Sequence, residues 1–199
     1  MSLMTDAALD PRAAEVLDFW FGAPGSAEHG RTRDLWFTKQ AATDALIGAR
    51  FGALIESALR GECDSWSATP RGALAQIVLL DQFTRNVFRD TPRAFAGDAR
   101  ALSVAQALVD QGHDRALSLH ERWFAYLPFE HAESLPLQDR AVGLFTQLAA
   151  DGLAAPLDWA IKHRDVVARF GRFPHRNSIL GRASSPEESA FLAQPGSRF

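Results

Sequence analysis

One predicted helical segment carries polar side chains on a single side. Asp81, Arg85 and Arg89 follow one another at intervals of four residues. Gln82 and Asn86 form a second row beside them. Guanidinium and amide groups together suit recognition of a planar carboxylate or of a phosphate, so the segment predicts one wall of an anion-binding pocket. The alternative is a solvated face, on which Asp81 and Arg85 form an ordinary ion pair within the helix.

The strongest charge asymmetry of the chain lies between residues 160 and 182. Six basic side chains stand against one acidic side chain there, a local charge of +5 in a chain whose formal net charge is -3. Pro174 makes the centre of this segment a rigid turn. The polar side chains around the turn are Arg172, His175, Arg176 and Asn177. They predict a compact anion site, unless acidic groups from elsewhere, such as Asp81 or Glu133, neutralise the arginines.

A third group of chemically capable side chains follows Tyr126, the single tyrosine. Pro128 is expected to end a helix and to leave the next residues on an irregular segment, where side chains can converge. These residues include Glu130, His131 and Glu133. An imidazole beside a carboxylate is a common general base. Helix capping and solvation of the surface would explain the same residues.

Two functions follow from these groups. The first is a helical scaffold that binds an anionic small molecule or an acidic peptide. Its contact residues are predicted to be Arg85, Asn86, Arg89, Arg172, His175, Arg176 and Asn177. The second is a hydrolase or lyase acting on an anionic substrate, with His175 or His131 as general base. Glu133 or Asp81 would then orient that histidine.

Two further alternatives stay open. A divalent metal ion held by His131, Glu133 and another carboxylate is a weaker form of the enzyme hypothesis. The polar residues would otherwise form buried structural networks, in which arginines and aspartates pair between helices.

The sequence lacks the motifs of several common classes of enzyme and nucleotide-binding protein. The sequence has no glycine-rich phosphate loop followed by Lys-Ser or Lys-Thr, no Gly-x-Gly-x-x-Gly and no Gly-x-Ser-x-Gly. His131-Ala132-Glu133 matches half of a zinc-deaminase signature, but Cys63 is the only cysteine, so the paired cysteines of that signature are absent. We therefore expect neither a cofactor nor a bound metal ion.

The composition is that of a soluble globular protein. Of 199 residues, 47% are hydrophobic and 23% charged. The net negative charge and the presence of only two lysines argue against a nucleic-acid partner. The longest uncharged stretch in the middle of the chain, residues 141–150, is half of the roughly 20 residues that a membrane-spanning helix needs. With one cysteine and no signal-peptide pattern, we expect a cytoplasmic protein that does not bind membranes.

Helix start and stop signals recur along the whole chain, and no segment alternates apolar and polar residues as a strand would. The predicted helices span residues 11–21, 42–60, 70–88, 92–111, 119–127, 134–150 and 157–170, with a last short helix from residue 186. About eight helices with short connections predict an all-α fold of stacked helical hairpins. No linker interrupts residues 1–199, which predicts a single domain. Its core is expected to include the aromatic run Phe19-Trp20-Phe21 and the pair Trp36-Phe37.

A family pattern runs through several of these segments. They are Val16-Leu17-Asp18-Phe19-Trp20-Phe21-Gly22, Pro70-Arg71-Gly72, Leu80-Asp81-Gln82-Phe83 with Arg85-Asn86-Val87-Phe88-Arg89, Tyr126-Leu127-Pro128 with His131 and Glu133, His163-Arg164-Asp165, Arg169-Phe170-Gly171-Arg172-Phe173-Pro174-His175-Arg176-Asn177 and Leu180-Gly181-Arg182. In these residues the chain resembles a mainly bacterial family, domain of unknown function 924. The resemblance spans nearly the whole chain and implies an all-helical fold related to tetratricopeptide-repeat proteins, without an established activity. Thr84 and Ala132 stand where the family pattern has proline and serine, which implies that neither position holds an indispensable reactive group.

Overall fold

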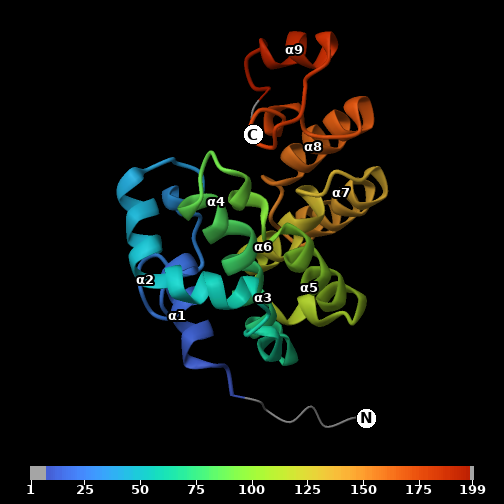
Figure 1. The fold of residues 1–199 in the computed structure, drawn as a ribbon. Coiled ribbons are helices and arrows are strands. Elements are labelled where there is room, and N and C mark those ends of the chain that lie inside the picture. The colour runs from blue at the N-terminus through green and yellow to red at the C-terminus, as the bar shows by residue number, and fades with distance from the viewer. Residues whose placement is uncertain (1–7, 198–199) are drawn as a thin grey trace.

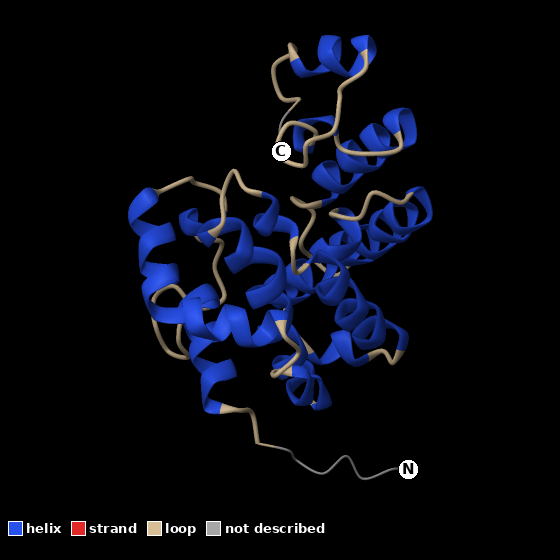
Figure 2. Cartoon of the chain, in the orientation of Figure 1, coloured by secondary structure: helices blue, strands red, loops and turns tan. Residues whose placement is uncertain are grey.

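The structure is a computed structural model that describes residues 8–197 of the chain. These residues form helices, turns and loops without a strand, as Figure 2 shows, and the predicted all-α fold is confirmed. The α-helices are α1 (Pro11–Phe21), α2 (Ala41–Leu59), α3 (Pro70–Ile77), α4 (Thr84–Val87), α5 (Asp98–Asp110), α6 (Leu119–Glu130), α7 (Leu135–Ala150), α8 (Leu157–Phe170) and α9 (Pro186–Leu192). A π-helix, η3 (Val78–Phe83), joins α3 to α4. Short 3-10 helices connect the others: η1 (Asp34–Trp36), η2 (Asp64–Ala68), η4 (Pro92–Phe95), η5 (His113–Ala116) and η6 (Pro174–Arg176).

Local capping explains why most helices begin and end where the sequence predicts. The Asp10 carboxylate accepts a hydrogen bond from the backbone N–H of Arg12 at the start of α1. Ser118 and Ser185 each form a complete capping box, at α6 and at α9. Gly171 ends α8 with a positive φ of 70°, which favours glycine.

The helical segment that starts at Thr69-Pro70 extends to Val87 close to prediction, but it is not a uniform α-helix. Residues 78–83 have π-helical hydrogen bonding, which places an extra residue in the turn that carries Asp81. The side chains of residues 78–83 therefore point in directions that differ from those in a regular α-helix. Nothing in the apolar periodicity of the sequence indicated this change.

The predicted helix over residues 92–111 is wrong at its start, over residues 92–97. Pro92 starts only the 3-10 helix η4, and α5 begins at Asp98 after Gly97. A Cβ atom on Gly97 would lie 2.1 Å from the backbone oxygen of Leu80. The backbones of η3 and of the start of α5 therefore approach closely, and this contact places Asp98 beside the π-helix.

The prediction that Pro128 ends its helix is also wrong. Helix α6 continues through Pro128 to Glu130, and His131 caps it. A proline this close to the end costs few backbone hydrogen bonds. All nine residues from Arg122 to Glu130 are buried, so packing on both sides favours the helical path over a break. Glu130 thus lies on the helix, and only His131 and Glu133 lie on the turn before α7.

The hydrophobic core lies where the N-terminal helices meet α5, α6 and α7. The largest fully buried side chains in it are Trp20, Phe51, Phe83, Phe124, Tyr126, Phe129 and Phe145. Trp20, Phe21 and Trp36 are buried as expected, whereas Phe37 is 59% exposed, so its predicted burial is wrong. A second, small cluster consists of Val166, Val167 and Phe173 under α8, with Phe170 and Phe191 packed on it.

The helices are arranged so that the second half of the chain extends away from the first. In Figure 1, α1 to α4 lie together, and α7, α8 and α9 follow one another away from them. Helix α7 packs against both α6 and α8. The π-helix packs against α6, and the turn after α8 is joined to the turn after α6 by a hydrogen bond from the backbone N–H of Phe173 to Glu133. Among the described helices, none is long and apolar enough to span a lipid bilayer.

Candidate functional site

Asp81 is the most deeply buried charged group of the candidate site. It lies on η3 with no solvent exposure. Its Oδ1 atom is 2.7 Å from Nδ1 of His131 and 3.1 Å from Nη1 of Arg85, and its Oδ2 accepts a hydrogen bond of 2.6 Å from Gln82. Burial alone would raise the pKa of Asp81. The positive charge of Arg85 and the contacts with His131 and Gln82 outweigh that effect and lower the pKa below its ordinary value, so the carboxylate is ionised.

His131 is the C-cap residue of α6, and its ring faces Asp81. An ionised carboxylate only accepts hydrogen bonds, so Nδ1 of His131 carries the proton and donates it to Asp81. The second nitrogen, Nε2, is then the unprotonated one. Burial, together with the charges of Arg85 and Arg176, lowers the pKa of His131 although Asp81 opposes the shift. The side chain keeps 15% of its surface exposed, which gives a neutral, basic imidazole partial access to water.

Arg85 links the π-helix to α5. Its guanidinium binds both carboxylate oxygens of Asp98, at 2.8 and 3.0 Å. The same side chain donates to the backbone oxygen of Asp81 at 2.6 Å. Both terminal nitrogens of the guanidinium are thus occupied by hydrogen bonds within the protein. Arg85 was predicted to contact an anion, and the structure places it in the framework behind Asp81.

Arg176 enters the site from η6 and differs from the other arginines. Its guanidinium stacks on Phe173 at 4.6 Å and on Phe95 at 4.8 Å from the ring centroids, with the side chain 8% exposed. The nearest acidic oxygen, Oδ2 of Asp98, lies 3.6 Å away, beyond hydrogen-bond distance. Nε of Arg176 is buried and donates to no group in the described part of the chain. Burial, with repulsion from Arg85, lowers the pKa of Arg176 to about 10, so the group stays charged at neutral pH.

Glu130 and His163 form a second carboxyl–imidazole pair beside the first. Oε1 of Glu130 is 3.1 Å from Nδ1 of His163, which also bonds the backbone oxygen of Trp159. Burial, and then the charge of Asp81, raises the pKa of Glu130 to about 8, while burial lowers the pKa of His163 to about 3. The pair is therefore uncharged near neutral pH. Its imidazole ring lies 6.4 Å from that of His131 between centroids.

Glu133 holds the C-terminal segment onto the turn after α6. Its carboxylate binds Arg182 through two bonds of 2.6 and 2.8 Å and accepts a third from the backbone N–H of Phe173. This is the neutralisation of the basic segment that the sequence left open as an alternative. A metal ion on His131 and Glu133 has no support, because no group of three or more His, Cys, Asp or Glu side chains in the described residues is placed to hold one.

Three other predicted anion ligands are paired within the protein. Asn86 and Arg89 both bind the carboxylate of Asp44 on α2, at distances of 2.7 to 2.9 Å. Arg172 binds both oxygens of Glu188, at 2.7 and 2.9 Å. The structure does not bring these side chains to Asp81. They tie α4 to α2 and the turn after α8 to α9.

Asn177 and His175 lie on the same turn as Arg176 but contact other groups. The amide of Asn177 donates to Ser184 at 3.1 Å and accepts from Arg182 at 3.0 Å. The half-buried ring of His175 lies 5.7 Å from that of Phe173. Of the residues predicted for the site, the structure brings together Asp81, Arg85, His131 and Arg176.

Three residues of this cluster were missed by sequence reasoning. Asp98 lay inside a wrongly extended helix, and no signal in the sequence marked the close contact at Gly97. Phe95, whose ring supports Arg176, belonged to the same misassigned segment. No signal in the sequence paired His163 with Glu130, because only the packing of α6 against α8 brings the two side chains together.

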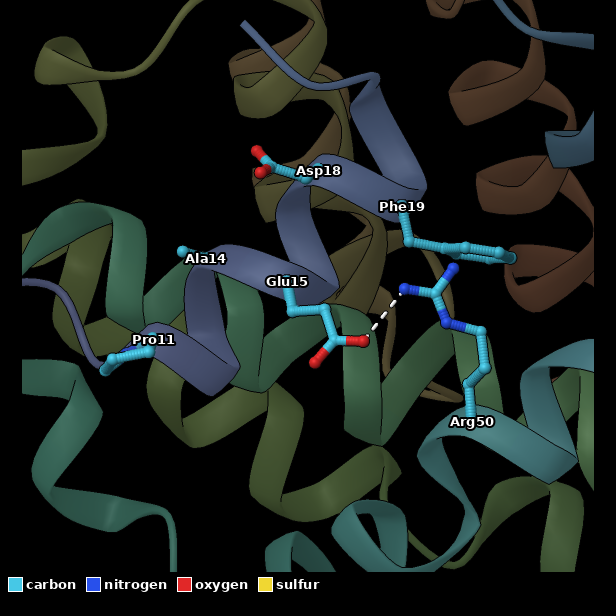
Figure 3. A pocket seen from close by; sticks show the side chains of 6 residues that line it. All are labelled: Pro11, Ala14, Glu15, Asp18, Phe19 and Arg50. Atoms are coloured by element: carbon cyan, nitrogen blue, oxygen red, sulfur yellow. Dashed lines mark hydrogen bonds and ion pairs between the residues drawn. The ribbon is translucent and has the colours of Figure 1, made fainter.

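A separate hollow of about 490 Å³ lies on α1 and α2 (Figure 3). It is lined by Pro11, Ala14, Glu15, Asp18, Phe19 and Arg50. Glu15 and Arg50 bridge it through an ion pair of 2.8 Å. The hollow is shallow and open, and it shares no residue with the cluster around Asp81.

Comparison with known proteins identifies the family. The pattern of the family described as "Bacterial protein of unknown function (DUF924)" matches residues 16–196. A solved structure, "Structure of Protein of Unknown Function ATU0120 from Agrobacterium tumefaciens", is 42% identical in sequence, with a TM-score of 0.81. That similarity covers 92% of this chain and 97% of the other chain. No curated protein matches the chain. The resemblance found in the sequence is thus confirmed, and the chain belongs to the DUF924 family of bacterial proteins.

Proposed function

We propose that the protein binds an anionic small molecule at Arg176, beside His131 and Asp81. The observation that carries the proposal is the contrast between Arg176 and the other arginines of the segment. Arg172 and Arg182 each hold a carboxylate through two hydrogen bonds. Arg176 is 93% buried as a residue, its Nε has no hydrogen-bond partner among the described residues, and its Nη1 makes only a long ion pair of 3.6 Å with Asp98.

A buried guanidinium N–H without an acceptor is costly, because the donor has lost water and gained no partner, and Nε of Arg176 is such a donor. A carboxylate or phosphate on a ligand would supply the missing acceptors. Phe95 and Phe173 hold the guanidinium plane and keep water from its faces, which strengthens the attraction to an anion. Since so little of Arg176 is exposed, a small molecule fits this position better than an acidic peptide does.

Fewer residues are proposed to contact the ligand than the sequence predicted. Arg85, Asn86, Arg89 and Arg172 support the fold, and Arg176 is the group that meets the ligand. The charge of Arg176 acts on the partly exposed His131, and the imidazole of His131 would contact the remainder of the ligand. The single cysteine, Cys63, is buried, and burial raises the pKa of its thiol. We propose that the protein acts in the cytoplasm, where such a thiol stays reduced.

A thermal-shift panel tests the proposal. Inorganic phosphate, sulfate, small mono- and dicarboxylates and phosphate esters are added to the wild type, to Arg176→Met and to Arg169→Met. Arg169 is the matched control, because its side chain is 51% exposed and pairs with Glu187. We expect at least one anion to raise the melting temperature of the wild type and of the control, but not of Arg176→Met.

Two outcomes would contradict the proposal. One is a wild type that no anion stabilises. The other is an Arg176→Met protein that responds to the same anion to the same extent. Loss of folding is not expected to obscure the test, because methionine replaces a buried charge whose ion pair with Asp98 is long and fills a similar volume between two phenylalanine rings. The melting temperature of the ligand-free variant checks this point.

A further inference from the structure

We propose that this site is catalytic and that His131 acts as a general base in the hydrolysis of an ester that carries an anionic group. The inference rests on the proposed function, because Arg176 must hold that anionic group for the ester to reach His131. It goes beyond binding by assigning a proton transfer to a stated atom, Nε2 of His131.

The first support is the geometry of the Asp81–His131 pair. The distance of 2.7 Å from Oδ1 to Nδ1 fixes the tautomer in which Nε2 is free to accept a proton. The carboxylate lies on the inner side of the ring and is buried, whereas the imidazole keeps 15% of its surface exposed. A buried carboxylate behind a partly exposed imidazole is the arrangement that orients a general base.

The second support is the number of bonds that fix Asp81. Gln82 holds Oδ2, and Arg85 holds both Oδ1 and the backbone oxygen. The π-helix brings these donors to one carboxylate, and π-helical turns are frequent at functional sites. Asp81 is thus a positioning residue, since it acts on the substrate only through His131.

The third support is the set of groups that face His131 from the neighbouring elements. Asp81 and Arg85 face it from the π-helix and α4, Arg176 from η6, and His163 with Glu130 from α8 and α6. Two positive charges oppose protonation of His131, and the Glu130–His163 pair is neutral. The imidazole is therefore available as a base at neutral pH, where a histidine of ordinary pKa would be partly protonated.

The proposed step uses water as the second reactant. Nε2 of His131 takes a proton from a water molecule while the water oxygen forms a bond to the carbonyl carbon of the ester. The carbon–oxygen bond to the leaving alcohol then breaks, and the proton on Nε2 passes to the alcohol oxygen. The products are a carboxylic acid and an alcohol, and His131 returns to its starting state. Arg176 holds the separate anionic group throughout.

Two chromogenic esters test the inference. Mono-4-nitrophenyl glutarate carries a free carboxylate, and 4-nitrophenyl butyrate is its uncharged counterpart. We expect the wild type to hydrolyse the charged ester with the higher kcat/KM, and His131→Gln to lose at least about 100-fold in kcat. His113→Gln, on η5, is the control for unspecific imidazole reactivity. Arg176→Met is expected to lose the preference for the charged ester.

The role of Asp81 is tested separately, because its replacement risks a folding defect. Asp81→Asn is expected to lower kcat while KM for the charged ester stays unchanged, whereas a merely structural role would move both. In the wild type, nitrogen NMR of labelled histidine is expected to show His131 with its proton on Nδ1. The proton on Nε2 in the folded protein would overturn the inference without any variant.

The two proposals fail in distinguishable ways. Stabilisation of the wild type by glutarate, without hydrolysis of either ester, would overturn the catalytic inference and leave anion binding intact. Undiminished hydrolysis by His131→Gln would also overturn it. No thermal response to glutarate or any other anion would instead contradict the binding function itself.

Discussion

Nδ1 of His131 lies 2.7 Å from Oδ1 of Asp81, although fifty positions separate the two residues in the chain. Asp81 is held by a π-helix, and His131 by the end of α6. The two elements meet because α3 and the π-helix pack against α6 in the core. This pair joins the polar wall predicted around Asp81 to the separate group predicted around His131.

Replacing Asp81 with alanine is expected to lower the free energy of unfolding by about 3–5 kcal/mol. The substitution leaves the buried side of Arg85 and the N–H of His131 without their shared acceptor, and breaking a buried pair costs about that much. Chemical denaturation followed by circular dichroism measures the effect. Asp165→Ala is the control, because that carboxylate is 65% exposed, and we expect it to change stability by less than about 0.5 kcal/mol. Equal effects of the two substitutions would show that the Asp81 network contributes no stability.

The sequence predicted where most helices of this site begin, but it did not predict which of their side chains meet in the folded protein. Caps such as Ser118 are local, so their spacing alone gives the starts of helices. The path of α6 through Pro128 was not predictable in this way, because burial of the whole helix outweighs a local breaker. Asp98 was missed for the same kind of reason, since only the contact of Gly97 with Leu80 brings it to Arg85. The identities of the paired acids likewise depend on tertiary packing.

Glu130 is expected to make stability fall as pH rises. Its pKa is raised to about 8 in the folded protein, from an ordinary value of 4.5, so the folded state binds the proton more tightly than the unfolded state does. The contribution of Glu130 is fully present below pH 4.5 and is lost as pH rises to about 8, by up to about 1.4 kcal/mol per pH unit. Urea unfolding of the wild type and of Glu130→Gln between pH 5 and 8 measures it. The glutamine variant should lack this slope, and parallel curves for the two proteins would contradict the assignment.

Glu133→Gln is expected to loosen the segment from Phe173 to Arg182. The substitution removes the charge that holds Arg182 through two bonds and weakens the contact with the backbone of Phe173. Hydrogen exchange should become faster in this segment and stay unchanged in α1 to α3. Glu187→Gln is the control, since that exposed residue pairs with the exposed Arg169 and makes no hydrogen bond with Arg182 or with the backbone of Phe173 among the described residues. Protection that is unaltered in residues 173–182 would show that Glu133 does not anchor the segment.

Gly97→Ala is expected to destabilise the protein by about 1–3 kcal/mol. The added Cβ would lie 2.1 Å from the Leu80 backbone oxygen, so the π-helix or α5 must move. Gly143→Ala on α7 is the opposite control, because its Cβ meets no atom within 4 Å. That substitution should stabilise the protein by about 0.5–1 kcal/mol, since alanine favours helix over glycine. Thermal unfolding distinguishes the two, and a neutral Gly97→Ala would contradict the close approach.

The most direct test of anion binding at Arg176 is the NMR signal of its own Nε–H group. The signal is identified in protein labelled with ¹⁵N-arginine as the one that disappears in Arg176→Met. Titration with glutarate or inorganic phosphate should shift it to a saturating limit, while the Nε–H signal of Arg172, already bonded to Glu188, stays in place. An Arg176 signal that remains fixed with every anion that binds the protein would contradict the account.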